Sequence, residues 1–182
     1  MNLELLIVLL FGGVPVVSSY YYIYTKASGG DISDKILWGG LKGNTFIAWV
    51  LSMLLTVVSY GYLFYFFVWK STLRDWEQTL LLASYVLFFN YAGQYGAVAM
   101  LDTVVEKKSG YLHFNLIMVA LSCVVFFIVA CVKSSGDTEG ILAIVAAGMM
   151  VFHHAYFDAY LWFRDFNPKG YASITSRMDT LS

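Results

Sequence analysis

The sequence is poor in charged side chains. Of its 182 residues only 13% are Asp, Glu, Lys or Arg, against about 25% in a typical soluble domain. Hydrophobic residues make up 59%, and the mean hydropathy is +0.68. The net charge of −1 provides neither a basic surface for nucleic acid nor an acidic tail. These shortages exclude an ordinary soluble domain and a nucleic-acid-binding protein, and they indicate that lipid surrounds most of the chain.

Cysteine is also scarce, with only Cys123 and Cys131, both in one apolar run. Eight helical residues at about 1.5 Å each would separate them by roughly 12 Å, too far for a disulfide. They are therefore expected to be apolar packing or lipid-facing residues.

Neither a signal peptide nor a catalytic motif is evident. No Lys or Arg precedes the first apolar run and no small-residue cleavage site follows it, so this run is expected to remain as a span. A Gly-rich phosphate loop, a Ser/His/Asp elbow and a loop His/Cys cluster are all missing. The sequence thus gives no indication of an enzyme.

Long hydrophobic runs are what the sequence has in abundance. A membrane-spanning helix needs about 20 apolar residues. Five runs without Lys or Arg meet this need, and none alternates with period two as a barrel strand would. The sequence predicts an all-α bundle of five transmembrane helices with short loops. The expected spans are approximately Leu3–Tyr24, Thr45–Trp69, Trp76–Leu101, Leu112–Val132 and Ile141–Phe163.

The charges that remain predict how the bundle lies in the membrane. One membrane domain over residues 1–163 is expected, followed by a polar tail over 164–182. The first loop, the third loop and the tail hold eight Lys or Arg, whereas the opposite side holds three. The positive-inside rule then predicts an exoplasmic N-terminus, with the first loop and the C-terminus in the cytoplasm. The composition does not indicate which membrane this is.

The fifth span carries the most unusual polar group, because Asp158 is the only acidic residue well inside any span. His154 lies four residues before it on the same α-helical face, while His153 is expected to point about 100° away. Three readings stay open: a hydrogen bond joining helices, a polar contact for an otherwise apolar ligand, or metal, haem or proton-relay chemistry. Three histidines are too few for a histidine-rich di-iron enzyme, and His113 lies too far along its helix to pair with His153 across a haem. No metal ligand is predicted.

Other spans contain small and polar residues at helical spacing. The third has Asn90 and Gln94 four residues apart, with Gly93 and Gly96 beside them. In the second, a stripe is formed by Ser52, Thr56, Ser59 and Tyr60. Such stripes usually indicate close helix–helix packing. Together with the many tyrosines, they also permit an internal cavity.

Several short motifs resemble the tryptophan-rich sensory protein/translocator protein family. The first loop has Trp38-Gly39-Gly40-Leu41-Lys42, and the second span ends with Gly61, Tyr65 and Val68-Trp69-Lys70. Asn90-Tyr91-Ala92 is similar to a segment of the family's third helix, and Asp158, Trp162 and Arg164 to its last helix. The family's prolines after the lysine and in the third helix are absent, and several of its Trp positions are Phe or Tyr. The resemblance implies five helices that bind tetrapyrroles, sterols or similar flat apolar ligands, with the first loop as a lid.

Two functions are compatible with these features. One is binding of a flat apolar molecule, tetrapyrrole- or sterol-like, in an aromatic pocket; a bound tetrapyrrole or lipid would then be the cofactor. The residues predicted to line or cap this pocket are Trp38, Tyr60, Asn90, Gln94, His154, Asp158 and Trp162. The other is a non-catalytic subunit of a larger membrane complex, for which the short loops are suited. A homodimer is a further possible assembly.

Overall fold

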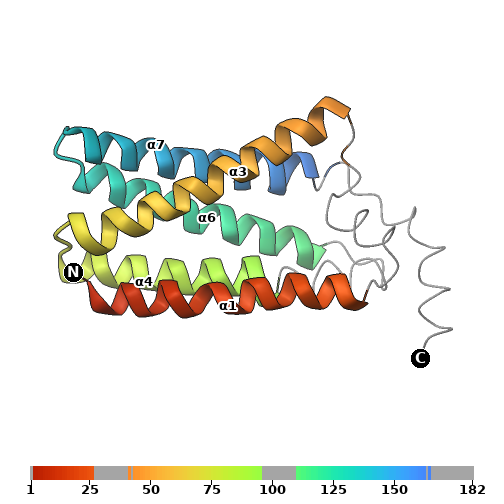
Figure 1. Ribbon diagram of the computed structural model, residues 1–182, viewed down its shortest axis with the longest axis horizontal. Coiled ribbons are helices and arrows are strands. Elements are labelled where there is room, and N and C mark those ends of the chain that lie inside the picture. The colour runs from red at the N-terminus through yellow and green to blue at the C-terminus, as the bar shows by residue number, and fades with distance from the viewer. Residues whose placement is uncertain (1, 27–40, 42, 96–109, 163, 165–182) are drawn as a thin grey trace, which may run out of the picture.

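The computed structural model describes residues 2–26, 41, 43–95, 110–162 and 164, and all secondary structure in these ranges is helical. There are five helical rods, three of which change from α- to π-helix before they end (Figure 1). The first and fourth rods are α1 (Leu3–Lys26) and α6 (Gly110–Lys133). The second is α3 (Gly43–Tyr65) continued by η1 (Phe66–Lys70), and the third is α4 (Asp75–Phe89) continued by η2 (Asn90–Tyr95). The fifth is α7 (Thr138–Phe152) continued by η3 (His153–Trp162).

These rods confirm the all-helical bundle predicted from the sequence. Among the described residues, three helices are long and apolar enough to cross a membrane: Gly43–Lys70, Tyr111–Lys133 and Thr138–Leu161. Leu3–Ser19 is a shorter apolar helix. The bundle also exposes large apolar side chains such as Phe11, Val17 and Val58, each about 70% accessible. A surface of this kind is suited to lipid rather than water.

The stripe of small polar residues on α3 faces into the bundle, away from the exposed apolar surface. Ser52, Thr56 and Ser59 are buried, and α3 packs along α7. The hydroxyl of Thr56 donates to the carbonyl of Ser52 one turn earlier, so its burial leaves no unpaired donor. The burial of Ser52 and Ser59 agrees with the predicted packing role, whereas Thr56 and Tyr60 of the same stripe also line the cavity described below.

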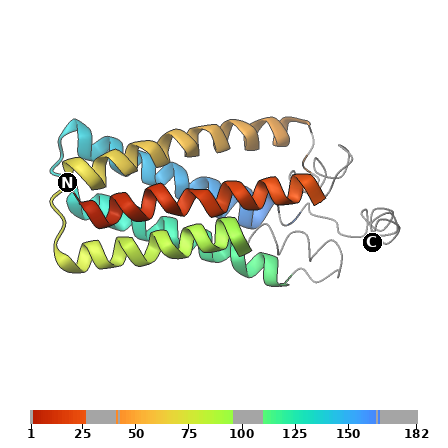
Figure 2. The same cartoon turned by 60° about the horizontal axis from the view of Figure 1, so that its bottom comes forward.

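The rods follow one another around the bundle in the order α1, α4, α6, α7, α3 (Figure 1, Figure 2). Helix α1 packs against α4 and η2, and α3 packs against α7. Between α1 and α3 there is almost no contact, and Figure 1 shows α3 diverging from α1 toward the end at which α3 begins. Among the described residues the ring of helices is therefore closed on four sides and open on the fifth along α3, while η1, the continuation of α3, does contact α1.

Glycines allow the close packing of α1 on the third rod. A Cβ at Gly93 of η2 would lie 2.7 Å from the Cα of Val16, which is backbone and cannot rotate away. A Cβ at Gly12 would collide with the ring of Phe89. By contrast, a Cβ at the adjacent Gly13 would meet nothing within 4 Å. Gly12 and Gly93 thus serve helix packing, whereas Gly13 borders open space.

The half of the bundle near the start of α1 has a solid core. Tyr85 of α4 stacks on Phe126 of α6 with ring centroids 4.2 Å apart, and Leu63, Phe67 and Leu81 are completely buried around them. Polar contacts close this end. The buried carboxylate of Glu77 accepts from Lys133 Nζ at 3.0 Å and from the backbone N–H of Arg74 at 2.7 Å. This clamp joins the start of α4 to the end of α6. The other half of the bundle is hollow.

Candidate functional site

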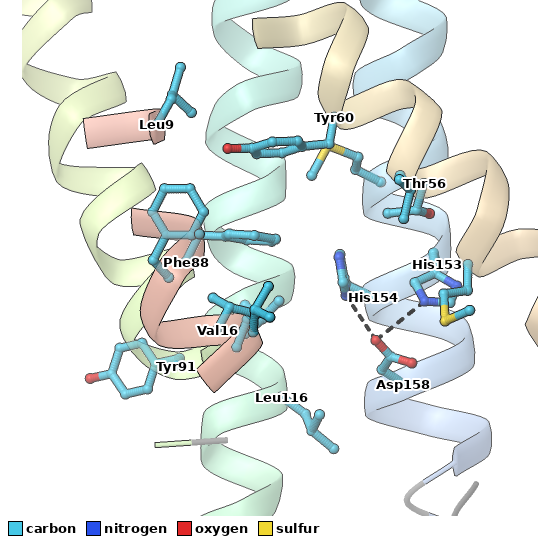
Figure 3. A pocket seen from close by; sticks show the side chains of 18 of the residues that line it. Leu9, Val16, Thr56, Tyr60, Phe88, Tyr91, Leu116, His153, His154 and Asp158 are labelled. Atoms are coloured by element: carbon cyan, nitrogen blue, oxygen red, sulfur yellow. Dashed lines mark hydrogen bonds and ion pairs between the residues drawn. The ribbon is translucent and has the colours of Figure 1, made fainter. Parts of the chain in front are cut away.

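The hollow half contains a cavity of about 620 Å³ with walls from all five rods. This volume lies within the range of roughly 300–1,000 Å³ found for small-molecule sites. Most of the wall is aliphatic or aromatic, and no Lys or Arg is among the described residues that line it. Its larger side chains are Leu9, Val16, Trp49, Met53, Tyr60, Phe88, Phe89, Tyr91, Leu116 and Met150. Polar groups gather at one side, where His153, His154 and Asp158 of η3 meet the cavity (Figure 3).

Asp158 is the centre of this polar group. Its Oδ2 accepts a hydrogen bond from His154 Nδ1 at 2.8 Å, and its Oδ1 accepts one from Trp49 Nε1 at 2.9 Å. The second of these bonds joins two helices whose residues are 109 positions apart in the chain. Both carboxylate oxygens are therefore occupied by N–H donors, as a carboxylate at membrane depth requires.

His153 also approaches the carboxylate, contrary to the orientation predicted from α-helical spacing. Its Nε2 lies 3.6 Å from Asp158 Oδ2, and its Nδ1 hydrogen-bonds Ser52 Oγ at 3.1 Å. The prediction was wrong because it assumed an α-helix, whereas His153–Trp162 is π-helical. A π-helix is closed by i→i+5 bonds and turns less per residue, so residues five apart share a face. The wider turn brings His153 and His154 together onto Asp158.

His154 has one ring nitrogen left over. Since a carboxylate oxygen only accepts, the proton shared with Asp158 belongs to His154 Nδ1, and Nε2 presents a lone pair. Nε2 is buried and has no hydrogen-bond partner. Figure 3 shows the ring extending from η3 with this nitrogen directed away from Asp158, toward the space beside Phe88 and Tyr60. The ring of Phe88 meets the imidazole edge to face with centroids 5.5 Å apart. An oriented hydrogen-bond acceptor thus lies in a mostly apolar wall.

No protein-family model matches this chain, and no curated protein or solved structure matches it either. The geometry of the cavity therefore carries the functional argument.

The residues predicted for the site fall into three groups. Tyr60, His154 and Asp158 line the cavity. Asn90 is half-buried in η2, where its side-chain amide donates to the carbonyl of Val86, and it is not among the lining residues. Gln94 and Trp162 belong to η2 and η3, but their side chains lie outside the described part of the chain, as does the whole of Trp38.

Sequence reasoning missed three residues of the site: Trp49, Ser52 and His153. Trp49 had a signal, because it is an indole placed inside a span rather than at the membrane interface, where tryptophan is enriched. Ser52 belonged to a stripe for which helix packing was the main expectation, with an internal cavity as the alternative. His153 had no usable signal, since only the local change of helix type turns it toward Asp158.

Proposed function

We propose that this protein binds a largely apolar small molecule inside the membrane, in the cavity between its helices. The single observation that carries the proposal is the unpartnered Nε2 of His154 beside a 620 Å³ apolar space. A buried acceptor without a partner costs free energy on the order of 1–3 kcal/mol. A ligand with a hydroxyl group would supply the missing donor after a side-chain movement that uncovers the buried Nε2, while its hydrocarbon part would fill the aromatic and aliphatic remainder.

The charge of the wall favours one ligand class over another. Tetrapyrroles usually carry carboxylates, and the described wall offers them Asp158 but no Lys or Arg. An anionic group near Asp158 would be repelled in a region of low dielectric constant. A neutral sterol-like alcohol has no such group. We therefore infer a sterol-like ligand, and a tetrapyrrole serves as the competing ligand in the test.

The open side of the bundle suggests how the ligand enters. The cavity is bordered by Val16 and Val17 of α1 and by Met53 and Val57 of α3, the two helices that barely touch. Val17 and Val57 are also among the exposed side chains of the bundle. A molecule dissolved in the hydrocarbon layer would reach the cavity sideways, between α1 and α3, without passing through water.

This route rests on a five-span topology, which we also propose. In it, α1 and the rod formed by α4 and η2 cross the membrane beside the three helices that are long and apolar enough. Leu3–Lys26 has 24 residues, or about 36 Å of helix, against a hydrocarbon core of roughly 30 Å. From the distribution of Lys and Arg we further propose that the N-terminus lies on the exoplasmic side and the hollow half near the cytoplasm.

Binding is tested by energy transfer from tryptophan to a fluorescent sterol analogue, with the protein in detergent micelles or nanodiscs. Trp49 forms part of the wall, so saturable transfer is expected. Gly13→Phe directs a ring into the cavity and is expected to weaken binding at least tenfold. Gly61→Phe is the matched control, because a Cβ there also meets nothing within 4 Å but Gly61 does not line the cavity.

The expected order of affinity is sterol above porphyrin, with His154→Ala weaker than wild type for the sterol. The ligand class would be wrong if the porphyrin bound more tightly than the sterol. The binding function itself would be refuted by the absence of saturable transfer with either probe, or by equal effects of Gly13→Phe and Gly61→Phe.

A further inference from the structure

The polar side of the cavity also has the composition of a metal site. One ligand atom each from His153, His154 and Asp158 lie within 4.8 Å of one another. From Asp158 Oδ2, His154 Nδ1 is 2.8 Å away and His153 Nε2 is 3.6 Å away. Two ligand atoms of a tetrahedral ion bound at roughly 2.0–2.1 Å lie about 3.3 Å apart. These two separations fall on either side of this value. The third, between the two imidazole nitrogens, is within 4.8 Å, so closing the cluster around an ion needs a movement of at most roughly 1.5 Å.

Two of the three ligands are held from outside by residues of α3, whereas the outer nitrogen of His154, Nε2, has no partner. His153 Nδ1 hydrogen-bonds Ser52 Oγ, which leaves Nε2 directed at the cluster. Asp158 Oδ1 accepts from Trp49 Nε1, which leaves Oδ2 for the ion. Second-shell contacts of this kind are typical of metal-binding histidines and carboxylates, because they fix the tautomer and the orientation of the ligands.

The electrostatics of the wall also suit a cation. The cluster contains one carboxylate, and the described residues around the cavity include no Lys or Arg that would repel a second positive charge. A divalent ion on two neutral imidazoles and one carboxylate would leave a net charge of +1. In the form described here, the proton on His154 Nδ1 takes the position that the ion would occupy.

We propose that His153 Nε2, His154 Nδ1 and Asp158 Oδ2 bind a divalent first-row transition-metal ion of the zinc type. Two imidazoles and one carboxylate suit such ions, whereas Mg²⁺ and Ca²⁺ prefer oxygen ligands. Three protein ligands leave a coordination position open toward the cavity. This inference is argued from the three side chains and not from what fills the apolar space. An ion on His154 Nδ1 would place the proton of the neutral imidazole on Nε2, so a ligand hydroxyl at that nitrogen would then accept a hydrogen bond instead of donating one.

The ten-residue π-helix His153–Trp162 provides a physical reason for this arrangement. Long π-helical stretches are rare, and short ones occur frequently at functional sites. In an α-helix, His153 and Asp158 would lie on different faces. The π-helix brings both histidines to one carboxylate, which packing of the helix alone does not require.

The test uses the full-length protein, purified in detergent, stripped with a chelator and titrated with Zn²⁺ against a chromophoric indicator. One Zn²⁺ per chain is expected, with no competition from Mg²⁺. Co²⁺ is expected to give the intense visible absorption of a tetrahedral site. His153→Ala and Asp158→Asn are each expected to weaken Zn²⁺ binding at least tenfold. His113→Ala, which removes the third histidine of the chain, is the matched control and should bind as wild type does.

A second pair of variants leaves all three ligands in place. It tests the site even if the variants that lack a ligand fail to fold. Ser52→Ala removes the partner of His153 and is expected to weaken binding roughly tenfold. Ser59→Ala, at a buried serine of the same stripe, should have no effect. The metal site would be refuted by no saturable Zn²⁺ binding, by equal losses in His113→Ala and His153→Ala, or by equal behaviour of the two serine variants. If Zn²⁺ binds but the sterol assay fails, the metal site is supported and only the sterol-binding proposal is refuted.

Discussion

The hydrogen bond from Trp49 Nε1 to Asp158 Oδ1 joins α3 to η3 and allows a quantitative test of the site. Trp49→Phe keeps an aromatic ring at this buried position but removes the N–H donor, which lies 2.9 Å from the carboxylate oxygen. Hydrogen bonds to charged groups contribute about 1.5–3 kcal/mol in soluble proteins. Side-chain hydrogen bonds between membrane helices average only about 0.6 kcal/mol, with a maximum near 1.7. A charged acceptor in a membrane bundle should therefore give a coupling energy of about 1–2 kcal/mol.

The coupling energy is measured by a double-mutant cycle with Asp158→Ala, which removes the acceptor, and in the cycle the cost of the smaller ring at position 49 cancels. Unfolding is followed by far-UV circular dichroism during titration with SDS in mixed micelles. The expected coupling corresponds to a roughly 5- to 30-fold change in the unfolding equilibrium constant.

Trp69→Phe provides the matched control, because Trp69 is 46% exposed at the end of η1. Its effect should lie within about 0.5 kcal/mol, as is usual for surface substitutions. A coupling energy below about 0.5 kcal/mol would show that the Trp49–Asp158 bond does not stabilise the bundle. Equal destabilisation by the two Trp→Phe variants would lead to the same conclusion.

Three further predictions concern the packing and the closed end of the bundle. Gly93→Ala should destabilise the protein by about 1–3 kcal/mol through backbone overpacking, whereas Gly61→Ala, where a Cβ meets nothing within 4 Å, should be neutral or slightly stabilising in the same SDS titration. Glu77→Gln should cost about 3–4 kcal/mol, the lower part of the usual range for a broken buried pair, because Lys133 keeps some access to solvent; a change under about 1 kcal/mol would contradict this. The backbone N–H of Gly140 holds the pKa of Asp137 below its usual range, so the stability that Asp137 contributes is present above its unfolded pKa and is lost as the pH falls through the folded one. Asp137→Ala should remove that part of the acid dependence, and an unchanged pH profile of the SDS midpoint would refute the cap.

The helical part of the fold could be predicted from the sequence because it depends on quantities that are local in the chain. A run of about 20 residues without charge can satisfy its backbone in lipid only by forming a helix, and the predicted span Leu112–Val132 lies within α6 (Gly110–Lys133). The α3 stripe likewise showed which face of that helix would be buried, because residues at helical spacing share a face. The predicted span Trp76–Leu101 agrees with α4 and η2 as far as Tyr95, and its remainder lies outside the described residues.

The site was predictable only in part, because its contacts depend on helix type and on helices far apart in the chain. The sequence alone determined a helical, lipid-compatible chain in which Asp158 and His154 needed partners at membrane depth. Which side chains are those partners depends on the tertiary structure. The π-helical turn brings His153 to the same carboxylate, and the packing of α3 beside α7 delivers Trp49 and Ser52. The gap between α1 and α3 was equally beyond sequence reasoning, since apolar residues that face lipid and those that face an internal cavity look the same in a sequence.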